Sequence, residues 1–425
     1  MMPVRRCLMS ARLRTGPSRE LWRTRTCWAV GLGIFLTVFT LVPPDAAYGR
    51  LSLPCLTHIT SQDALLLAGP DGKILCGKNE KRPCIPASSL KVLTALAFLD
   101  RMGPSYRFRT EFYMDATQNL KVKGYGDPLL ISEALQEIAV RLKMEIQTFQ
   151  SLLLDVCYFS PEIVIPGCGG STNPYDAPVG ALCANFNTVA FKRDKKGRIL
   201  SAERQTPLIP YARDRIRSLG LKRGRYTFIH DSQRAARYAG ELLLYFLRKE
   251  GVACDGTIRL GEVVPTDRLI HRYASVFSLE EVVQKMMESS SNFMANQLLL
   301  VLGAETFGPP ATLDKGVRAV MDFAKKSVNL NHFKMVEGSG LSRQNRISAS
   351  DMLDVLKRFK AYRYLLKNDE NVFYKTGSLK GIRTRVGYVE NGGGDLYYFV
   401  IFFNQPRHKM NATLNCVKRA VARRP

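Results

Sequence analysis

Residues 396–403 constrain the fold more than any other segment, because they read Leu-Tyr-Tyr-Phe-Val-Ile-Phe-Phe without a charged position. A strand that is apolar on both faces is typical of the interior of a sheet that helices cover on both sides. Residues 384–389 form a second β-rich run, and Asn391-Gly392-Gly393-Gly394 supplies a turn between the two runs. The C-terminal region therefore predicts a long hairpin inside a covered sheet.

Residues 88–102 predict a helix that is buried at the centre of the same domain, since they are apolar on nearly every face. Gly103-Pro104 ends this helix. Two short apolar runs precede it, at residues 64–68 and 74–76, and Pro70-Asp71-Gly72 separates them. This pattern is typical of a β-hairpin, so the domain begins with a hairpin and a buried helix.

The stretch 105–275 has a different residue pattern from the flanking segments, and this pattern predicts a separate and mostly β insertion. Its short strand-like runs are broken by glycine and proline, and one amphipathic helix runs from near Asp231 to Lys249. The strand-like runs are residues 112–114, 151–155, 163–165 and 257–260. A chain of 425 residues also exceeds the ~100–200 residues that are usual for one domain. We expect a domain of residues 50–104 plus 276–425, interrupted by an accessory domain of residues 105–275.

The first 49 residues predict an export signal. Seven arginines between Arg5 and Arg25 precede an apolar run at residues 28–42, and Ala47-Tyr48-Gly49 follows as a small-x-small cleavage site. The run is shorter than the ~20 residues of a membrane span. We therefore expect a periplasmic protein whose signal is cleaved near Gly49, with an uncleaved membrane anchor as the alternative.

Eight of the ten cysteines follow the signal segment: Cys55, Cys76, Cys84, Cys157, Cys168, Cys183, Cys254 and Cys416. An even number in an exported chain predicts up to four disulfides, and buried free thiols are the alternative. The spacings contain no close CxxC pair, and the five histidines form no cluster. We therefore expect neither a metal nor a cofactor.

Ser88 and Lys91 form the first of three motifs that carry chemistry. They are three residues apart on the predicted helix, so their side chains lie on one face. A serine hydroxyl needs a base, and a lysine can act as one when an apolar setting lowers its pKa from about 10.4. The pair predicts a nucleophile and its base, whereas an N-cap serine with a surface lysine is the alternative for an isolated match.

The second and third motifs are Ser290-Ser291-Asn292 and Lys375-Thr376-Gly377-Ser378. A serine hydroxyl with an amide two residues later can relay a proton and hold a substrate backbone, and a helix cap is the alternative. The third motif follows a strand-like run, so an extended substrate could add to that strand. Lys375, Thr376 and Ser378 would then hold a terminal carboxylate, while Gly377 allows a close approach of the backbone.

Several stretches around these motifs resemble the class C low-molecular-mass penicillin-binding proteins, the D-alanyl-D-alanine carboxypeptidase/endopeptidase family. Residues 85–97 resemble the nucleophile helix of that family, and Gly124-Tyr125-Gly126-Asp127-Pro128 resembles its GGGDP-type turn. Residues 185–189, 337–348 and 375–379 resemble further signatures. The resemblance runs from about residue 60 to residue 405.

The resemblance implies an α/β (α+β) fold of the DD-peptidase/β-lactamase type, with a five-stranded antiparallel sheet between helices and an accessory region between the first two motifs. It also implies a role for each motif residue. Ser88 would be the acylated nucleophile and Lys91 its base, and Ser290 with Lys375 would return a proton to the leaving D-alanine. Asn292 would contact the substrate amide, and the backbone N–H groups of Ser88 and Ser378 would form the oxyanion hole.

The sequence departs from the family pattern at three positions. Ser291 and Glu337 each stand where the family usually has aspartate, and Lys380 replaces a small hydroxyl residue at the rim of the expected cleft. Asp127 and Arg343 lie in family stretches that adjoin the substrate side chain, so we expect them to bind substrate. A turn-forming aspartate and a loop arginine are the alternatives for these two.

The expected function is that of a serine-type D-Ala-D-Ala carboxypeptidase that acts on peptidoglycan stem peptides and binds β-lactams covalently, with cleavage of D-alanyl cross-links left open. The net charge of +25 suits a carboxylate-rich wall polymer and peripheral contact with a membrane, whereas export argues against nucleic acid. A catalytically idle peptidoglycan-binding protein of the same fold and a β-lactamase are the alternatives.

Overall fold

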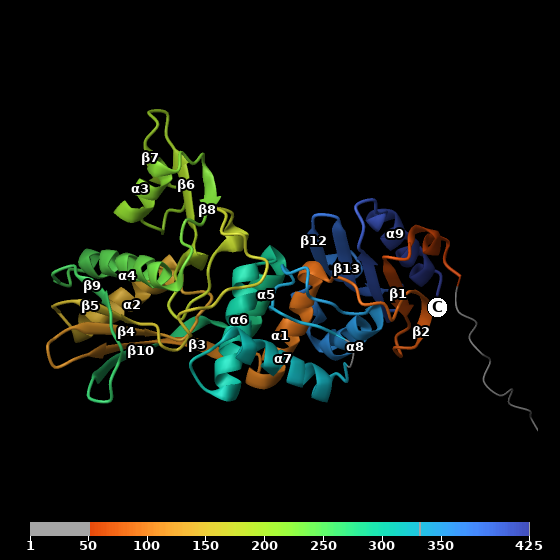
Figure 1. Cartoon of the computed structure of the whole chain (residues 1–425), viewed down its shortest axis with the longest axis horizontal. Helices are drawn as coiled ribbons and strands as arrows, with labels where there is room; N and C mark the ends of the chain where they lie inside the picture. The colour runs from red at the N-terminus through yellow and green to blue at the C-terminus, as the bar shows by residue number, and fades with distance from the viewer. Residues whose placement is uncertain (1–51, 331–332, 425) are drawn as a thin grey trace, which may run out of the picture. The chain divides into compact units, whose positions relative to one another are not determined.

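A six-stranded sheet brings the two ends of the described chain together, in the order β11-β12-β13-β14-β1-β2 (Figure 1). All neighbouring strands in it are antiparallel. The strands are β1 (Ala64–Ala68), β2 (Ile74–Lys78), β11 (Lys367–Asp369), β12 (Val372–Leu379), β13 (Ile382–Glu390) and β14 (Leu396–Phe403). Both predicted hairpins are confirmed. The sheet has one strand more than the resemblance implied, and its edge strand β11 has only three residues.

The computed structural model describes residues 52–330 and 333–424. The predicted signal segment, residues 1–49, lies outside these described residues. Within them, no helix combines the length and the apolar character that crossing a bilayer requires. The described residues form one compact unit.

Strand β14 is buried on both faces, as its sequence predicted. Tyr398, Val400 and Phe402 belong to the core on the side of α8 (Ala349–Phe359). Phe399 and Ile401 pack in a second core, which also contains residues of α9 (Met410–Ala422). The alternation follows from the two-residue period of a strand, and it places a helical layer on each side of the sheet.

The segment that carries Ser88 begins as the 3-10 turn η2 (Ala87–Leu90) and continues as α1 (Lys91–Met102). The predicted single helix is therefore wrong at its first turn. Ala87 has a left-handed φ of 47°, so the chain turns sharply before the helix starts. Every side chain of α1 from Lys91 to Leu99 is buried, which confirms the predicted central helix. Its neighbours include α5 (Leu279–Ser289), α6 (Asn292–Phe307) and α7 (Leu313–Ser327).

The inserted stretch contains two sheets and three α-helices (Figure 1). It is therefore richer in helix than the mostly β insertion that the sequence predicted. One sheet has the order β10-β3-β4-β5-β9 and the other has the order β7-β6-β8. The strands are β3 (Arg107–Met114), β4 (Leu120–Gly124), β5 (Leu152–Asp155), β6 (Val189–Arg193), β7 (Ile199–Ser201), β8 (Gly224–Tyr226), β9 (Ile258–Leu260) and β10 (Arg268–Ser278), and the helices are α2 (Ser132–Glu145), α3 (Pro210–Ser218) and α4 (Ser232–Lys249). The strand expected at residues 163–165 is wrong. These residues form a loop between Pro161 and Pro166, where proline removes backbone donors.

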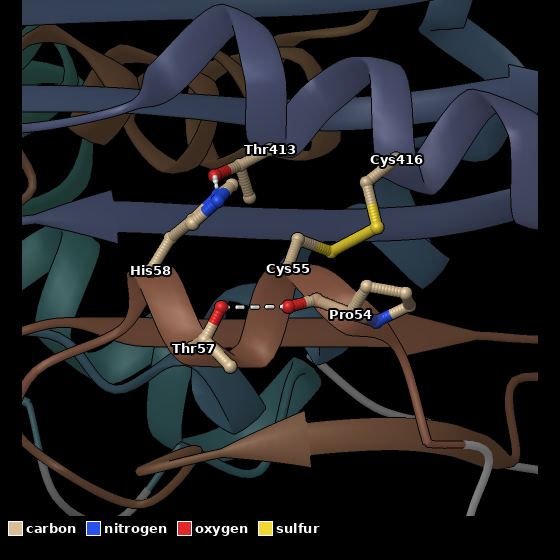
Figure 2. Close-up of a disulfide and its surroundings, with 6 residues drawn as sticks. All are labelled: Pro54, Cys55, Thr57, His58, Thr413 and Cys416. Carbon is tan, nitrogen blue, oxygen red and sulfur yellow. Dashed lines mark hydrogen bonds between the residues drawn. A yellow bond between two sulfur atoms is a disulfide. The ribbon is translucent and has the colours of Figure 1, made fainter.

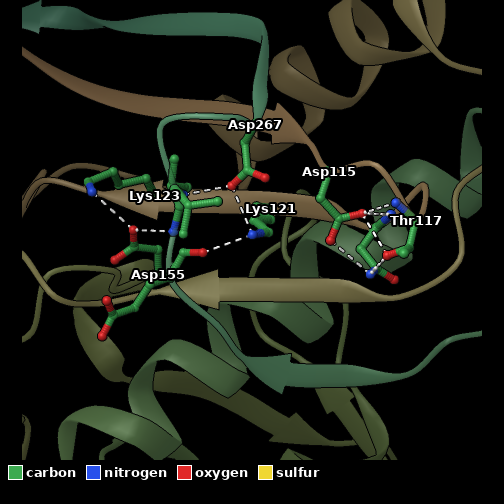
Figure 3. Close-up of polar contacts among 10 residues, drawn as sticks. Asp115, Thr117, Lys121, Lys123, Asp155 and Asp267 are labelled. Carbon is green, nitrogen blue, oxygen red and sulfur yellow. Dashed lines mark hydrogen bonds and ion pairs between the residues drawn. The ribbon is translucent and has the colours of Figure 1, made fainter.

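Two ion pairs anchor β4 in the five-stranded sheet (Figure 3). The buried Lys121 lies 2.8 Å from Asp267, and its Nζ also donates to the carbonyl of Glu262. Lys123 lies 3.0 Å from Asp155, whose other contacts include the backbone N–H of Val263. Buried charges need such partners, so β4 is tied to the segment that leads into β10.

A disulfide joins Cys55 of η1 (Pro54–His58) to Cys416 of α9 (Figure 2). The two residues are 361 positions apart in sequence, and their Cα atoms are 6.1 Å apart. His58 Nδ1 lies 2.9 Å from Thr413 Oγ1 in the same contact. Further disulfides were predicted, but five cysteines within residues 52–330 are free thiols. They are Cys84, Cys157, Cys168, Cys183 and Cys254.

Candidate active site

Lys91 and Ser88 meet at the junction of η2 and α1. Lys91 Nζ lies 3.0 Å from Ser88 Oγ, 2.8 Å from Asn292 Oδ1 and 2.7 Å from the carbonyl oxygen of Ser339. The Lys91 side chain is fully buried, whereas Ser88 is half-buried and open to a reactant. The structure thus brings Asn292 and Ser339, which lie 201 and 248 positions from Lys91 in sequence, into contact with its Nζ. Two of the three predicted motifs meet here.

The surroundings of Lys91 favour a neutral amine. Burial lowers the pKa of Lys91 well below its usual range, and the positive charge of Lys375 lowers it further, while Glu337 acts in the opposite direction. A neutral amine has a lone pair that can accept the proton of Ser88 Oγ. The distance and the lowered pKa are those that a serine nucleophile and a lysine base require.

Ser290 and Lys375 form a second pair. Ser290 ends α5 with a left-handed φ of 54°, and Lys375 Nζ lies 2.8 Å from its Oγ. Burial lowers the pKa of Lys375 to about 8. Ser291 caps α6, because its Oγ accepts a hydrogen bond from the Met294 N–H at 3.2 Å. The serine that replaces the family aspartate therefore fixes the helix turn that presents Asn292.

Strand β12 offers a free edge beside Ser88. In the described chain β11 pairs only with Val372–Tyr374, so the residues from Lys375 to Leu379 have a neighbour strand on one side alone. A Cβ added to Gly377 would lie 2.8 Å from the Ser88 backbone nitrogen and 2.3 Å from Thr384 Oγ1. Glycine is thus required where the strand touches the nucleophile turn.

Thr384 was not predicted from the sequence, although it secures this contact. Its Oγ1 donates to the carbonyl of Pro86 at 2.8 Å, which ties β13 to the residues just before Ser88. A single threonine in a β-rich run carries no distinguishing signal in one sequence. Only the register of β12 and β13 places it opposite Gly377.

Glu337 is the second functional residue that the sequence did not identify. Its buried carboxylate accepts hydrogen bonds from five donors: Asn296 Nδ2, Ser339 N, Ser339 Oγ, Ser342 N and Asn345 Nδ2. These bonds fix the loop whose Ser339 carbonyl contacts Lys91. They also hold Gly340, where an added Cβ would lie 1.8 Å from the Ala87 carbonyl oxygen. The departure Glu337 was visible in the sequence, but its role was not.

The insertion reaches the site through α6 and through one loop. Gln297 of α6 is fully buried and holds the carbonyls of Gly126 and Gly180, donating to them at 3.2 and 3.0 Å. A Cβ on Gly167 would lie 3.1 Å from the Cα of Ser342, so the loop around Gly167 packs against the Glu337 loop. Parts of residues 105–275 therefore support the wall of the site.

The predicted substrate-binding residues Asp127 and Arg343 lie in different parts of the structure. Arg343 donates to the carbonyl of Lys380, so it spans from the Glu337 loop to the turn after β12. Asp127 is buried and accepts a hydrogen bond from the Leu129 N–H at 2.8 Å. Among the described residues, no hydrogen bond or ion pair links Asp127 to Ser88, Lys91 or Ser290, and the geometry favours the turn-forming alternative for it.

Replacing Asp127 by asparagine is expected to stabilise the protein above pH 6. Burial raises the pKa of Asp127 to about 6, so the folded state binds its proton more tightly than the unfolded chain. Stability is therefore lost as the pH rises from about 4 towards 6, by roughly 2 to 3 kcal/mol in total. Urea unfolding at pH 4 and pH 7.5 measures this difference. Asp100→Asn, at an exposed position, is the control. The prediction would be contradicted if both variants changed the free energy of unfolding equally at both pH values.

With this geometry in place, comparisons with known proteins identify the family. The model of the D-Ala-D-Ala carboxypeptidase 3 (S13) family matches residues 64–216 and 223–367, which is more than half of the chain. The chain belongs to this family, and the resemblance to the class C low-molecular-mass penicillin-binding proteins is confirmed.

Two curated relatives have similar sequences. The D-alanyl-D-alanine carboxypeptidase DacB of Haemophilus influenzae is 27% identical over 203 residues, which are 40% of this chain and 41% of that protein. The D-alanyl-D-alanine carboxypeptidase of Actinomadura sp. strain R39 is 25% identical over 335 residues, which are 67% of this chain and 62% of that protein. The matched regions thus span less than two thirds of either relative.

Two solved structures share the fold. Penicillin binding protein 4 (dacB) from Haemophilus influenzae matches with a TM-score of 0.68 and 22% identity, covering 86% of this chain and 96% of that chain. A predatory peptidoglycan endopeptidase from Bdellovibrio bacteriovorus matches with a TM-score of 0.50 and 16% identity, covering 84% and 90%. At these identities the comparison confirms the α/β architecture.

Proposed function

We propose that the chain is a serine-type D-Ala-D-Ala carboxypeptidase that acts on peptidoglycan stem peptides through an acyl-enzyme. One observation carries the proposal: a buried Lys91 with a lowered pKa lies 3.0 Å from Ser88 Oγ. Membership of the family and the names of both curated relatives support the substrate class. The export signal predicted for residues 1–49 agrees with a periplasmic enzyme.

In the proposed acylation, Ser88 Oγ attacks the carbonyl of the penultimate D-alanine while neutral Lys91 accepts its proton. The backbone N–H groups of Ser88 and Ser378 stabilise the oxyanion, an arrangement that the close approach of Gly377 to the Ser88 nitrogen supports. The peptide bond then breaks. The pair Lys375 and Ser290, 2.8 Å apart, delivers a proton to the leaving amine.

Substrate binding in this proposal uses the free edge of β12. An extended peptide adds to the edge, Asn292 contacts its amide, and Lys375, Thr376 and Ser378 hold the terminal carboxylate. Arg343 orders the rim through its bond to the Lys380 carbonyl. Water then attacks the Ser88 ester, releases the shortened peptide and restores the hydroxyl.

Labelled penicillin tests the proposal directly. The wild-type protein is expected to take up label on Ser88, and Ser88→Ala is expected to take up none. Ser289→Ala serves as the control, because Ser289 is an exposed serine directly before Ser290. It should take up label like the wild type. Labelling of Ser88→Ala, or none of the wild type, would overturn the assignment of the nucleophile.

The same experiment separates the alternatives. An idle peptidoglycan-binding protein would not be acylated at all. A β-lactamase would be acylated but would lose the label within seconds, because it positions a group that drives hydrolysis of the drug adduct. We expect the adduct on Ser88 to persist for minutes.

A further inference from the structure

Residues 189–226 fold into the three-stranded sheet β7-β6-β8 and helix α3, and we call them the basic lobe (Figure 1). They contain twelve lysines and arginines but only three acidic residues, so they carry nine of the net +25 charges of the chain. Arg193 Nη2 of β6 donates to the carbonyl of Leu221 at 3.3 Å, which ties the segment after α3 to the sheet. Charge of one sign that is concentrated in one small unit suits an anionic partner.

The acidic residues of the lobe do not neutralise this surplus. Each of them pairs with an arginine inside the lobe, Asp194 with Arg198, Asp214 with Arg217, and Glu203 with Arg225. Among residues 52–330 and 333–424, the nine other cations of the lobe form no ion pair, and all except Arg215 are exposed. The nine are Lys192, Arg193, Lys195, Lys196, Arg204, Arg213, Arg215, Lys222 and Arg223.

The turn between β6 and β7 holds two of these lysines at its tip. The Asp194 carboxylate accepts hydrogen bonds from the backbone N–H groups of Lys196 and Arg198, both at 2.9 Å. Its backbone carbonyl also accepts a bond from the Gly197 N–H at 3.0 Å. An aspartate that bonds to the following backbone in this way fixes a turn. Lys195 and Lys196 are therefore presented to solvent from a defined piece of backbone.

Exposed apolar side chains accompany the cations. Lys192 and Leu200 are cross-strand partners, so their side chains lie next to each other on one face of the sheet. Phe191 is buried on the other face, which leaves the face of Lys192 and Leu200 outward. Leu200 and Leu219, the residue that follows α3, are each 41% exposed.

This combination of side chains distinguishes between the possible anionic partners. Lysine and arginine together with exposed leucine are typical of protein surfaces that lie in a membrane interface, where phosphate groups adjoin an apolar layer. A hydrated wall polymer offers carboxylates but no layer that receives a leucine. The export predicted for the chain separates it from nucleic acid.

We propose that the basic lobe binds a membrane surface that contains anionic phospholipids. Its lysines and arginines lie against the phosphate groups, and Leu200 and Leu219 enter the headgroup layer. No residue of the candidate active site takes part. The lobe would thus hold the protein beside the membrane whatever the state of Ser88.

The test is sedimentation with vesicles of the chain from Arg50 onwards, which lacks the predicted export signal and keeps the compact described unit. Vesicles of equal parts phosphatidylglycerol and phosphatidylcholine are compared with vesicles of phosphatidylcholine alone. Replacing four exposed lobe lysines by glutamine is expected to lower the partition coefficient for the anionic vesicles at least about tenfold. Each lysine near an anionic surface contributes about fivefold, so the loss of two contacts suffices. The changes are Lys192→Gln, Lys195→Gln, Lys196→Gln and Lys222→Gln.

A matched control removes four exposed lysines outside the lobe and should bind the anionic vesicles like the wild type. Its changes are Lys81→Gln, Lys143→Gln, Lys325→Gln and Lys326→Gln. Leu200→Ser combined with Leu219→Ser keeps every charge and is expected to lower the partition coefficient at least about fivefold, through loss of apolar burial. All three variants should take up penicillin like the wild type, which shows that they are folded.

Several results would overturn the proposal. Equal binding of the wild type to both kinds of vesicle would do so, as would an equal loss in the control, which would indicate a general charge effect. Unchanged binding by the leucine variant, or sedimentation with purified peptidoglycan but not with vesicles, would assign the lobe to a wall polymer instead. Ser88→Ala should bind vesicles like the wild type, so failure of the proposed catalytic function is seen separately.

Discussion

Lys91→Met is expected to slow the acylation of Ser88 by about 10²- to 10⁴-fold, the usual contribution of a positioned base. Methionine matches the lysine stem in length and suits the fully buried site, but it has no lone pair that can take the hydroxyl proton. Asn292 Oδ1 and the Ser339 carbonyl would lose their shared partner. The rate of penicillin uptake by the purified variant measures the effect.

Lys326→Met, an exposed position on α7, provides the control for this prediction. It should acylate at the wild-type rate. Circular dichroism of both variants establishes that they are folded. An acylation rate for Lys91→Met within a few-fold of the control would show that Lys91 is not the base.

Glu337→Ala is expected to lower the free energy of unfolding by about 3 to 5 kcal/mol, because it leaves a network of buried donors without their acceptor. The five bonds to this carboxylate hold the loop that carries Ser339 and Gly340. Acylation should fall as well, since the loop positions both Lys91 and the turn before Ser88. Urea unfolding followed by fluorescence gives the stability change.

Two variants bracket this result. Glu288→Ala removes an exposed glutamate next to the second motif and should change stability little. Glu337→Asp restores the carboxylate on a shorter stem, so it should fall between Glu337→Ala and the wild type. Equal stability of Glu337→Ala and Glu288→Ala would contradict the role of this network.

The parts of the fold that the sequence predicted are those fixed by local pattern. The apolar run of β14 needs cover on both sides whatever surrounds it, and the hairpin of β1 and β2 follows from a turn signal between two apolar runs. The sequence also predicted Ser88, Lys91, Ser290 and Lys375 as candidate site residues, because each lies in a short motif with its own chemistry. The structure then brings all four close together.

The parts that the sequence did not predict depend on contacts between distant segments. Glu337 matters through five bonds to residues on α6 and its own loop, and Thr384 matters only through the register of β12 with β13. The pairing of Cys55 with Cys416 spans 361 residues, so no local pattern indicates it. The strand expected at residues 163–165 was wrong because an apolar run needs a partner strand as well as β propensity.

The role of Ser88 as nucleophile is tested by following a stem peptide ending in D-Ala-D-Ala by mass spectrometry, with the wild-type protein and with Ser88→Ala. The wild type is expected to release one D-alanine per peptide, and a brief acid quench should trap the shortened peptide as an ester on Ser88. The Ser88→Ala variant should release none. Release of D-alanine by Ser88→Ala at the wild-type rate, or an ester on a different residue, would show that Ser88 is not the nucleophile.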